Sequence, residues 1–169
     1  MRKTKLLADV IMDKLKKCLV IIPAYNEAQN IERVVNNLIN NYPQYDYVIV
    51  NDGSTDETEK ICLKNKYQIL NLPINMGIGG AVQTGYRYAR DNGYEMAVQI
   101  DGDGQHDVRF LDEMIKLIID EQADVVIGSR FVEKKGFQSS QLRRIGIKFL
   151  SNIAWVLTGV RVRDITSGY

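Results

Sequence analysis

Short apolar runs alternate along the chain with stretches in which apolar residues recur every three or four positions. The apolar runs predict β-strands over 18–22, 45–50, 68–72, 97–100 and 123–127. The helical spacing predicts helices over 28–41, 55–66, 81–91, 108–121 and 141–159. Because strand and helix alternate, we predict an α/β fold with a mostly parallel sheet and helices on both faces.

Residues 1–17 predict an amphipathic helix ahead of a domain spanning 18–169, because lysines occupy the positions between its apolar residues. This helix would pack on the domain, on a second copy of the chain in a homo-oligomer, or on an anionic membrane surface. The basic, aromatic-bearing helix at 141–159 would face either the core, an acceptor or a membrane. Residues 161–169 lack a helix cap or polar end, so we expect the domain to be truncated at its C-terminal end.

Length, charge and cysteine usage narrow the function classes. The 169 residues suffice for one domain with a sizeable core. The chain has 22 Lys and Arg against 21 Asp and Glu, and this nearly neutral balance gives no electrostatic reason to expect nucleic-acid binding. Cys18 and Cys62 lack the spacing of a zinc or redox motif, so we interpret them as packing residues in a reducing compartment. Without an apolar run of about 20 residues, we expect a cytoplasmic protein and leave contact with the inner face of a membrane open.

An apolar strand that ends in closely spaced acids is the strongest chemical signal. Asp101 and Asp103 stand two positions apart, and Gly102 frees the backbone between them to bend. With Gln105 they offer the hard oxygen ligands that Mg²⁺ or Mn²⁺ prefers, in a site for a phosphate-bearing substrate. The alternative is a polar turn, since Asp-Gly pairs are ordinary turn residues. The single histidine, His106, is either structural or a contact to phosphate or metal.

Other phosphate-binding motifs fit poorly. The segment Gly77-Ile78-Gly79-Gly80 suggests dinucleotide binding, but that fingerprint needs a small residue at Val82 and belongs after the first strand. No Gly-Lys-Ser or Gly-Lys-Thr occurs, which excludes a Walker motif. No Ser-His-Asp or Cys-His arrangement emerges either.

Four segments in a defined order follow successive predicted strands. They are Ile21-Ile22-Pro23-Ala24-Tyr25-Asn26-Glu27, Val50-Asn51-Asp52-Gly53-Ser54-Thr55-Asp56, Asn75-x-Gly77-x-Gly79-x-Ala81 and Asp101-Gly102-Asp103-Gly104-Gln105-His106. Together they resemble the family 2 glycosyltransferases over about 18–169. Two later segments are similar to the branch with dolichyl-phosphate mannosyltransferase and polyprenyl-phosphate hexosyltransferases, namely Gly128-Ser129-Arg130-Phe131 and Asp164-Ile165-Thr166-Ser167-Gly168-Tyr169.

The resemblance implies a GT-A fold and inverting, metal-dependent transfer of a sugar from a UDP- or GDP-linked donor. The acceptor would be a polyprenyl phosphate or a growing glycan, as in cell-wall or polysaccharide biosynthesis. Asp101 and Asp103 match the Asp-x-Asp pair that binds metal and donor diphosphate, with Gln105 as a further ligand. The residues matched to the nucleotide are Pro23, Tyr25 and Glu27 in the first loop, Asp52 at the base, and Gly79 along the nucleotide.

The catalytic candidates are Asp103, Arg130 and Asp164. Breaking the sugar–phosphate bond builds negative charge on the departing diphosphate, which a divalent cation and Arg130 would stabilise. A hydroxyl acceptor requires a base, for which Asp164 is the candidate, whereas a polyprenyl phosphate is already ionised. In the second case Asp164 would position Arg144 or Arg163. A nucleotidyltransferase of similar fold and a non-catalytic fragment that binds nucleotide sugar remain as alternatives.

Overall fold

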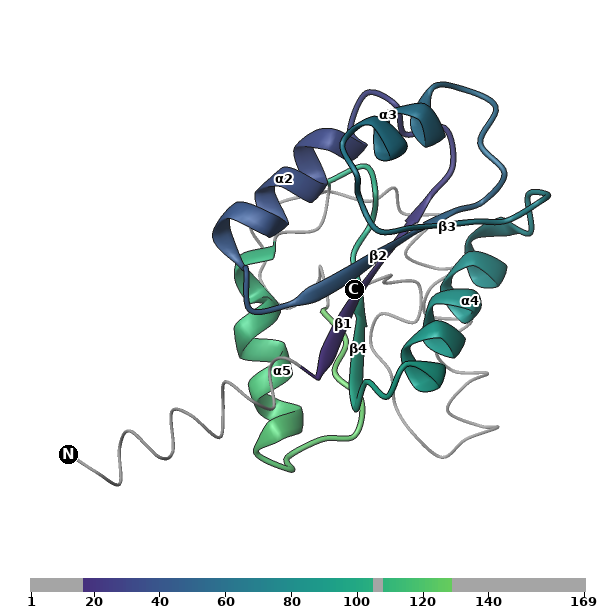
Figure 1. Cartoon of the computed structure of the whole chain (residues 1–169). Helices are drawn as coiled ribbons and strands as arrows, with labels where there is room; N and C mark the ends of the chain where they lie inside the picture. The colour runs from purple at the N-terminus through teal and green to yellow at the C-terminus, as the bar shows by residue number, and fades with distance from the viewer. Residues whose placement is uncertain (1–16, 105–107, 129–169) are drawn as a thin grey trace, which may run out of the picture.

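A parallel four-stranded sheet forms the centre of the computed structural model, which describes residues 17–104 and 108–128 (Figure 1). In sheet order the strands are β3 (Ile69–Asn71), β2 (Asp46–Asn51), β1 (Cys18–Ala24) and β4 (Met96–Gln99). Neighbouring strands are parallel throughout, with Ile22 opposite Ile49 and Val20 opposite Val98. The carboxyl ends of all four strands therefore meet at one edge of the sheet.

The central strand β1 is buried on both faces, which explains its continuous apolar run. All seven of its residues are buried. Side chains alternate between the two faces of a strand. Val20 and Ile22 accordingly lie in one apolar cluster, while Leu19 and Ile21 lie in the other. The prediction of a strand buried within a parallel sheet is confirmed.

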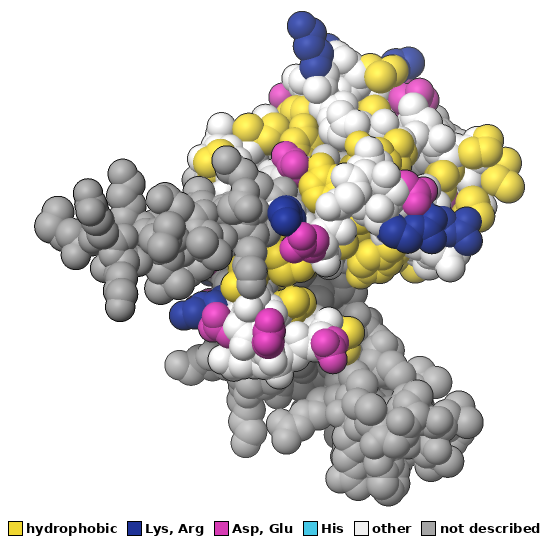
Figure 2. All heavy atoms as spheres, turned by 60° about the horizontal axis from the view of Figure 1, so that its bottom comes forward, with side chains coloured by type: hydrophobic (Ala, Val, Ile, Leu, Met, Phe, Trp, Pro, Cys, Tyr) yellow, Lys and Arg dark blue, Asp and Glu magenta, His cyan; other side chains and the backbone are white. Residues whose placement is uncertain are grey.

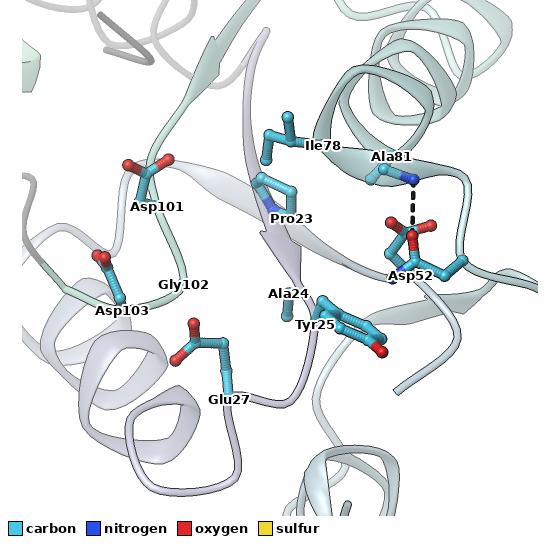
Figure 3. Close-up of a pocket in the computed structure, with 12 residues that line it drawn as sticks. Pro23, Ala24, Tyr25, Glu27, Asp52, Ile78, Ala81, Asp101, Gly102 and Asp103 are labelled. Carbon is cyan, nitrogen blue, oxygen red and sulfur yellow. Dashed lines mark hydrogen bonds between the residues drawn. The ribbon is translucent and has the colours of Figure 1, made fainter. Parts of the chain in front are cut away.

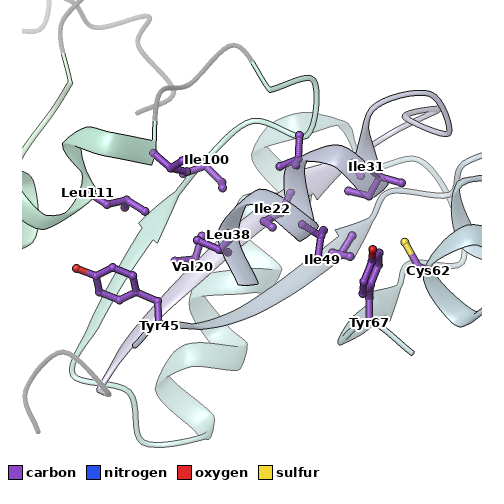
Figure 4. Packing of buried hydrophobic residues seen from close by; sticks show 14 of the residues in the cluster. Val20, Ile22, Ile31, Leu38, Tyr45, Ile49, Cys62, Tyr67, Ile100 and Leu111 are labelled. Atoms are coloured by element: carbon purple, nitrogen blue, oxygen red, sulfur yellow. The ribbon is translucent and has the colours of Figure 1, made fainter. Parts of the chain in front are cut away.

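Helices cover both faces of the sheet, as predicted. One face carries α2 (Ile31–Asn41), α3 (Thr58–Lys64), the 3-10 turn η1 (Val108–Phe110) and α5 (Leu111–Ile119), and the other carries α4 (Gly77–Asp91) (Figure 1). On the first face, Ile31 and Leu38 of α2 share an apolar cluster with Val20, Ile22 and Ile49 (Figure 4). This apolar contact packs α2 against the sheet.

Small residues bring α4 close to β1. Ala81, Gly85 and Ala89 are buried and spaced by four, so they share one side of the helix. A Cβ atom on Gly85 would lie 2.3 Å from Cγ2 of Ile21. The helix therefore approaches the strand at a distance that only glycine allows at this position.

The run at 123–127, predicted as a fifth strand, pairs with no strand among the described residues. Val125 and Ile127 are 74% and 42% exposed. The segment instead borders a cavity of about 370 Å³ beside β4. A strand needs a partner edge as well as apolar residues, and the local pattern specifies only the latter. The prediction of a strand here is wrong.

Helix α4 begins at Gly77, four residues earlier than the predicted start at residue 81. Its amino end is stabilised from outside the helix, because Asp52 accepts the N–H of Met76 at 2.7 Å. Asn75 accepts the N–H of Gly77 at 2.9 Å. Such N–H groups have no partner within a helix. The glycines at 77–80 therefore form the first turn of α4, where the sequence predicted a loop.

Other predictions lie outside the described residues, namely Gln105, His106, Arg130, Asp164, the helix at 141–159 and the helix over 1–17 except for Lys17. None of the helices in 17–104 and 108–128 is long and apolar enough to cross a membrane. On the face shown in Figure 2, acidic and basic side chains are interspersed, in line with the nearly balanced total charge.

Candidate functional site

A cavity of about 380 Å³ opens at the carboxyl edge of the sheet. Segments that follow all four strands line it (Figure 3), namely Pro23, Ala24, Tyr25, Glu27, Asp52, Asn75, Gly77, Ile78, Ala81, Asp101, Gly102 and Asp103. From β1 the chain continues outward to β2 and β3, and it then crosses to β4 on the other side of β1. The strand order therefore reverses next to β1, which is the switch point of the sheet. Open α/β sheets bind their ligands at such a switch point.

Asp52 is a buried acid in the wall of this cavity. It follows β2 directly and is only 3% exposed. Its Oδ1 atom accepts the N–H of Met76 at 2.7 Å, and its own N–H donates to the carbonyl of Ala24 at 2.9 Å. Within the described residues, Oδ2 makes no hydrogen bond. Asp52 therefore keeps one acceptor oxygen available to a ligand N–H or hydroxyl.

Asn26 joins the loop after β1 to the loop after β2. Its carboxamide oxygen accepts the N–H groups of Thr55 at 2.8 Å and Asp56 at 3.3 Å. The backbone of Asn26 has φ +58°, a left-handed conformation that asparagine tolerates better than most residues. Tyr25 and Glu27 on either side both line the cavity, so the link at Asn26 fixes their position.

Thr58 and Asp56 make a second link between the same loops. The fully buried hydroxyl of Thr58 accepts the N–H of Glu27 at 2.8 Å and donates to the carboxylate of Asp56. Asp56 also accepts the N–H groups of Thr58 at 2.9 Å and Ala28 at 3.1 Å. Desolvation would raise the pKa of Asp56, but these hydrogen bonds to the charged form together lower its pKa below the ordinary value. The ionised carboxylate therefore holds the loops together.

The acidic loop after β4 lies close against the end of β1. Gly102 is buried, and a Cβ atom there would lie 2.9 Å from the carbonyl oxygen of Pro23. Only glycine allows this approach without a shift of the backbone. Gly102 thus sets Asp101 and Asp103 beside the loop that follows β1.

Asp101 and Asp103 have the chemistry to bind a divalent cation. Their carboxylates lie on the same side of the cavity as Glu27, across from Asp52 (Figure 3). Gln99 donates from Nε2 to Asp101 at 3.3 Å and so orients that carboxylate. Residues 17–104 and 108–128 contain no group of three or more His, Cys, Asp or Glu able to hold a metal. Two carboxylates nevertheless fit Mg²⁺, which often takes one or two and completes its shell with waters and substrate phosphates.

The structure brings most of the predicted site residues together. The cavity is lined by Pro23, Tyr25, Glu27, Asp52, Asp101 and Asp103. Gly79 lies in the first turn of α4 next to Ile78, which lines the cavity, but Gly79 itself does not. Gln105, Arg130 and Asp164 lie outside the described residues.

The links that Asn26, Asp56 and Thr58 make between the two loops were not predicted from the sequence. An asparagine in a strand-to-helix loop is a weak signal for left-handed backbone. Asn26 and Thr55 are 29 positions apart, and Glu27 and Thr58 are 31 positions apart. Local spacing carries no information about contacts over such separations.

A parallel sheet with helices on both faces and a polar cavity at its switch point defines a ligand-binding α/β protein. The chain belongs to glycosyl transferase family 2, whose sequence profile matches residues 19–164. The structure of glucosyl-3-phosphoglycerate synthase from Mycobacterium tuberculosis with UDP is similar, with a TM-score of 0.61 and 19% identity. That match covers 93% of this chain and 57% of the other. It confirms the predicted GT-A fold.

Several relatives match nearly the whole chain. The chain is 37% identical over 168 residues to the UDP-N-acetylglucosamine–dolichyl-phosphate N-acetylglucosaminyltransferase of Methanococcus voltae, over 88% of this chain and 66% of the relative. It is 31% identical over 161 residues to the polyprenol monophosphomannose synthase of Mycolicibacterium smegmatis, over 91% of this chain and 60% of the relative. The chain thus spans 60% to 66% of the length of these two proteins.

Proposed function

We propose that this chain binds a nucleoside diphosphate sugar in the cavity and supplies the catalytic domain for its transfer to a polyprenyl phosphate. The observation that carries the proposal is the convergence of the loops after β1, β2 and β4 on one cavity, with Asp52 on one side and Asp101 and Asp103 on the other. The reaction class follows from membership of glycosyl transferase family 2. The acceptor class follows from the names of both relatives, which contain dolichyl phosphate or a phosphorylated polyprenol.

The nucleoside would lie at the Asp52 side of the cavity. There the second carboxylate oxygen of Asp52 can accept an N–H of the base, and the half-exposed ring of Tyr25 offers a stacking surface. The amino end of α4, which contributes Gly77 and Ile78 to the lining, favours negative charge and so suits the diphosphate. The name of the Methanococcus voltae relative favours UDP over GDP.

Asp101 and Asp103 would hold Mg²⁺ or Mn²⁺ against the donor diphosphate, with Gln105 as a further ligand. When bound, the ion would neutralise charge that develops on the departing diphosphate. Gln99 orients Asp101 for this role, and Gly102 lets the acidic loop lie close to Pro23. Because Asp101 and Asp103 would hold the ion, we expect transfer to depend on a divalent cation.

A polyprenyl phosphate needs no general base, because its oxygen is already ionised near neutral pH. Attack by that oxygen on the anomeric carbon, opposite the leaving diphosphate, would invert the configuration. We assign Arg130 to stabilising the departing diphosphate and Asp164 to positioning a neighbouring arginine. If a glycan hydroxyl were the acceptor, Asp164 would serve as the base instead.

A transfer assay tests the proposal. The chain is incubated with radiolabelled UDP-N-acetylglucosamine, UDP-glucose or GDP-mannose, with Mn²⁺ and a short polyprenyl phosphate. We expect a lipid-linked sugar of inverted anomeric configuration from one donor, and none from the unphosphorylated polyprenol. Donor binding without any lipid product would support the alternative of a non-catalytic nucleotide-sugar-binding fragment. Binding of no nucleotide would contradict the proposal altogether.

A further inference from the structure

A row of hydrogen bonds at the start of α2 leads from the cavity wall to the acidic loop. Asn30, the N-cap residue of α2, donates from Nδ2 to Glu27 Oε2 at 2.8 Å and makes no side-chain cap. The Asn30 carboxamide oxygen accepts a bond from Nη2 of Arg33 at 3.4 Å. The same Arg33 nitrogen donates to the main-chain carbonyl of Asp103 at 3.1 Å. Glu27 and the acidic loop are therefore connected through the side chains of Asn30 and Arg33, neither of which was predicted as a site residue.

Gly104 leaves space for the Arg33 guanidinium. A Cβ atom on Gly104 would lie 2.7 Å from Nη2 and 2.8 Å from Nη1 of Arg33. The backbone of Gly104 also has φ +76°, which side-chain-bearing residues rarely adopt. The guanidinium therefore lies directly against the main chain that carries Asp103.

We propose that Arg33 is a positioning residue for the metal-binding loop. It holds the main chain of Asp103 and Gly104 against α2, so that the carboxylate of Asp103 stays on the cavity side and the metal is bound tightly. A guanidinium cannot itself ligate a cation, so Arg33 acts through Asp103. The inference rests on the proposed function, because it gives the acidic loop the task of binding metal.

Arginine suits this position better than lysine. Its Nη2 atom reaches both Asn30 and Asp103 from a flat group that fits over Gly104. A lysine ammonium at the same place could reach the carbonyl of Asp103 but would not lie flat on the glycine. Lysine should therefore restore part of the effect.

The test compares the Mn²⁺ affinity of Arg33→Met, Arg33→Lys and wild type, measured by electron paramagnetic resonance with saturating UDP. Arg33→Met should weaken Mn²⁺ binding by about tenfold or more, as loss of groups that orient metal ligands does. Arg33→Lys should fall between Arg33→Met and wild type. UDP affinity at saturating Mn²⁺ should stay within about twofold of wild type, which general damage to the cavity would not allow.

Arg87→Met is the matched control, because Arg87 is exposed on α4 ten residues beyond Gly77, about 15 Å along the helix. It should leave Mn²⁺ affinity unchanged. Equal Mn²⁺ affinity in Arg33→Met and wild type would overturn the inference. If Arg33→Met fails to fold, Arg33→Gln, which removes the guanidinium but keeps a polar side chain and leaves the acidic loop unchanged, replaces it: weaker Mn²⁺ binding supports the inference and wild-type binding overturns it. A wild-type chain without Mn²⁺-dependent nucleotide binding would instead overturn the proposed function.

Discussion

Asn26 and Thr55 lie 29 positions apart in the chain, yet the carboxamide oxygen of Asn26 accepts the backbone N–H of Thr55 at 2.8 Å. This bond makes the loops after β1 and β2 one unit at the edge of the sheet. A change in either loop therefore moves the wall of the cavity. The geometry of the proposed donor site depends on residues that do not line it.

Two variants of Asn26 separate its side-chain bonds from its backbone conformation. Glycine adopts φ +58° without strain, so Asn26→Gly removes the hydrogen bonds alone, whereas Asn26→Ala also adds backbone strain. We expect Asn26→Gly to lower the free energy of unfolding by about 1 kcal/mol, and Asn26→Ala by about 1 kcal/mol more. Chemical denaturation measures both. UDP affinity should fall in each variant, and a wild-type affinity in Asn26→Gly would show that the link does not shape the cavity.

Asp52 can be tested for its structural and its ligand role separately. Asp52→Asn retains an oxygen for the N–H of Met76, whereas Asp52→Ala leaves that N–H without its acceptor. The alanine variant should therefore lose about 1–3 kcal/mol of unfolding free energy and the asparagine variant much less. Both should bind UDP at least about tenfold more weakly, because the charged acceptor is lost. A stable Asp52→Asn protein with unchanged UDP affinity would remove Asp52 from the nucleotide site.

Gly85 should be the most sensitive glycine of α4. In Gly85→Ala the new methyl group would lie 2.3 Å from Cγ2 of Ile21, in a buried contact between helix and strand. We expect a loss of about 1–3 kcal/mol in thermal unfolding, the usual range for overpacking. Gly79→Ala in the same helix is the control, since a Cβ there meets nothing within 4 Å. It should change stability by no more than about 1 kcal/mol.

The two cysteines should be unreactive in the folded chain. Burial raises the pKa of Cys18 to about 12, and burial together with the charge of Glu59 raises the pKa of Cys62 to about 11. At about pH 8 the folded chain should react with a thiol reagent at least about a hundredfold more slowly than the chain in denaturant. Rapid labelling of both thiols in the native protein would contradict their placement in the core.

The raised thiol pKa values also predict a loss of stability in alkaline solution. Thiols of the unfolded chain lose their protons from about pH 8.5, while the folded chain retains them until its higher pKa values. The unfolded state then binds fewer protons, so the free energy of unfolding falls as the pH rises through this window. Denaturation of wild type and a Cys18→Ala, Cys62→Ala double variant should show a smaller fall for the variant.

Much of the fold could be predicted because its signals are local. The apolar run of β1 and the helical spacing of α2 each reflect the surface that the element buries. The segment at 123–127 was misassigned because a strand also needs an edge to pair with. The acids Asp101 and Asp103 were found from their position at a strand end. The bond from Arg33 to Asp103, across 70 positions, could not be found, because it depends on how α2 lies against the loop that follows β4.

The central claim is that Asp101 and Asp103 bind a divalent cation that holds the donor diphosphate. Calorimetric titration of UDP with and without Mn²⁺, in wild type and in an Asp101→Asn, Asp103→Asn double variant, tests it most directly. We predict that Mn²⁺ strengthens UDP binding to wild type by about tenfold or more and has no effect on the folded double variant. Equal strengthening by Mn²⁺ in both proteins would contradict the claim.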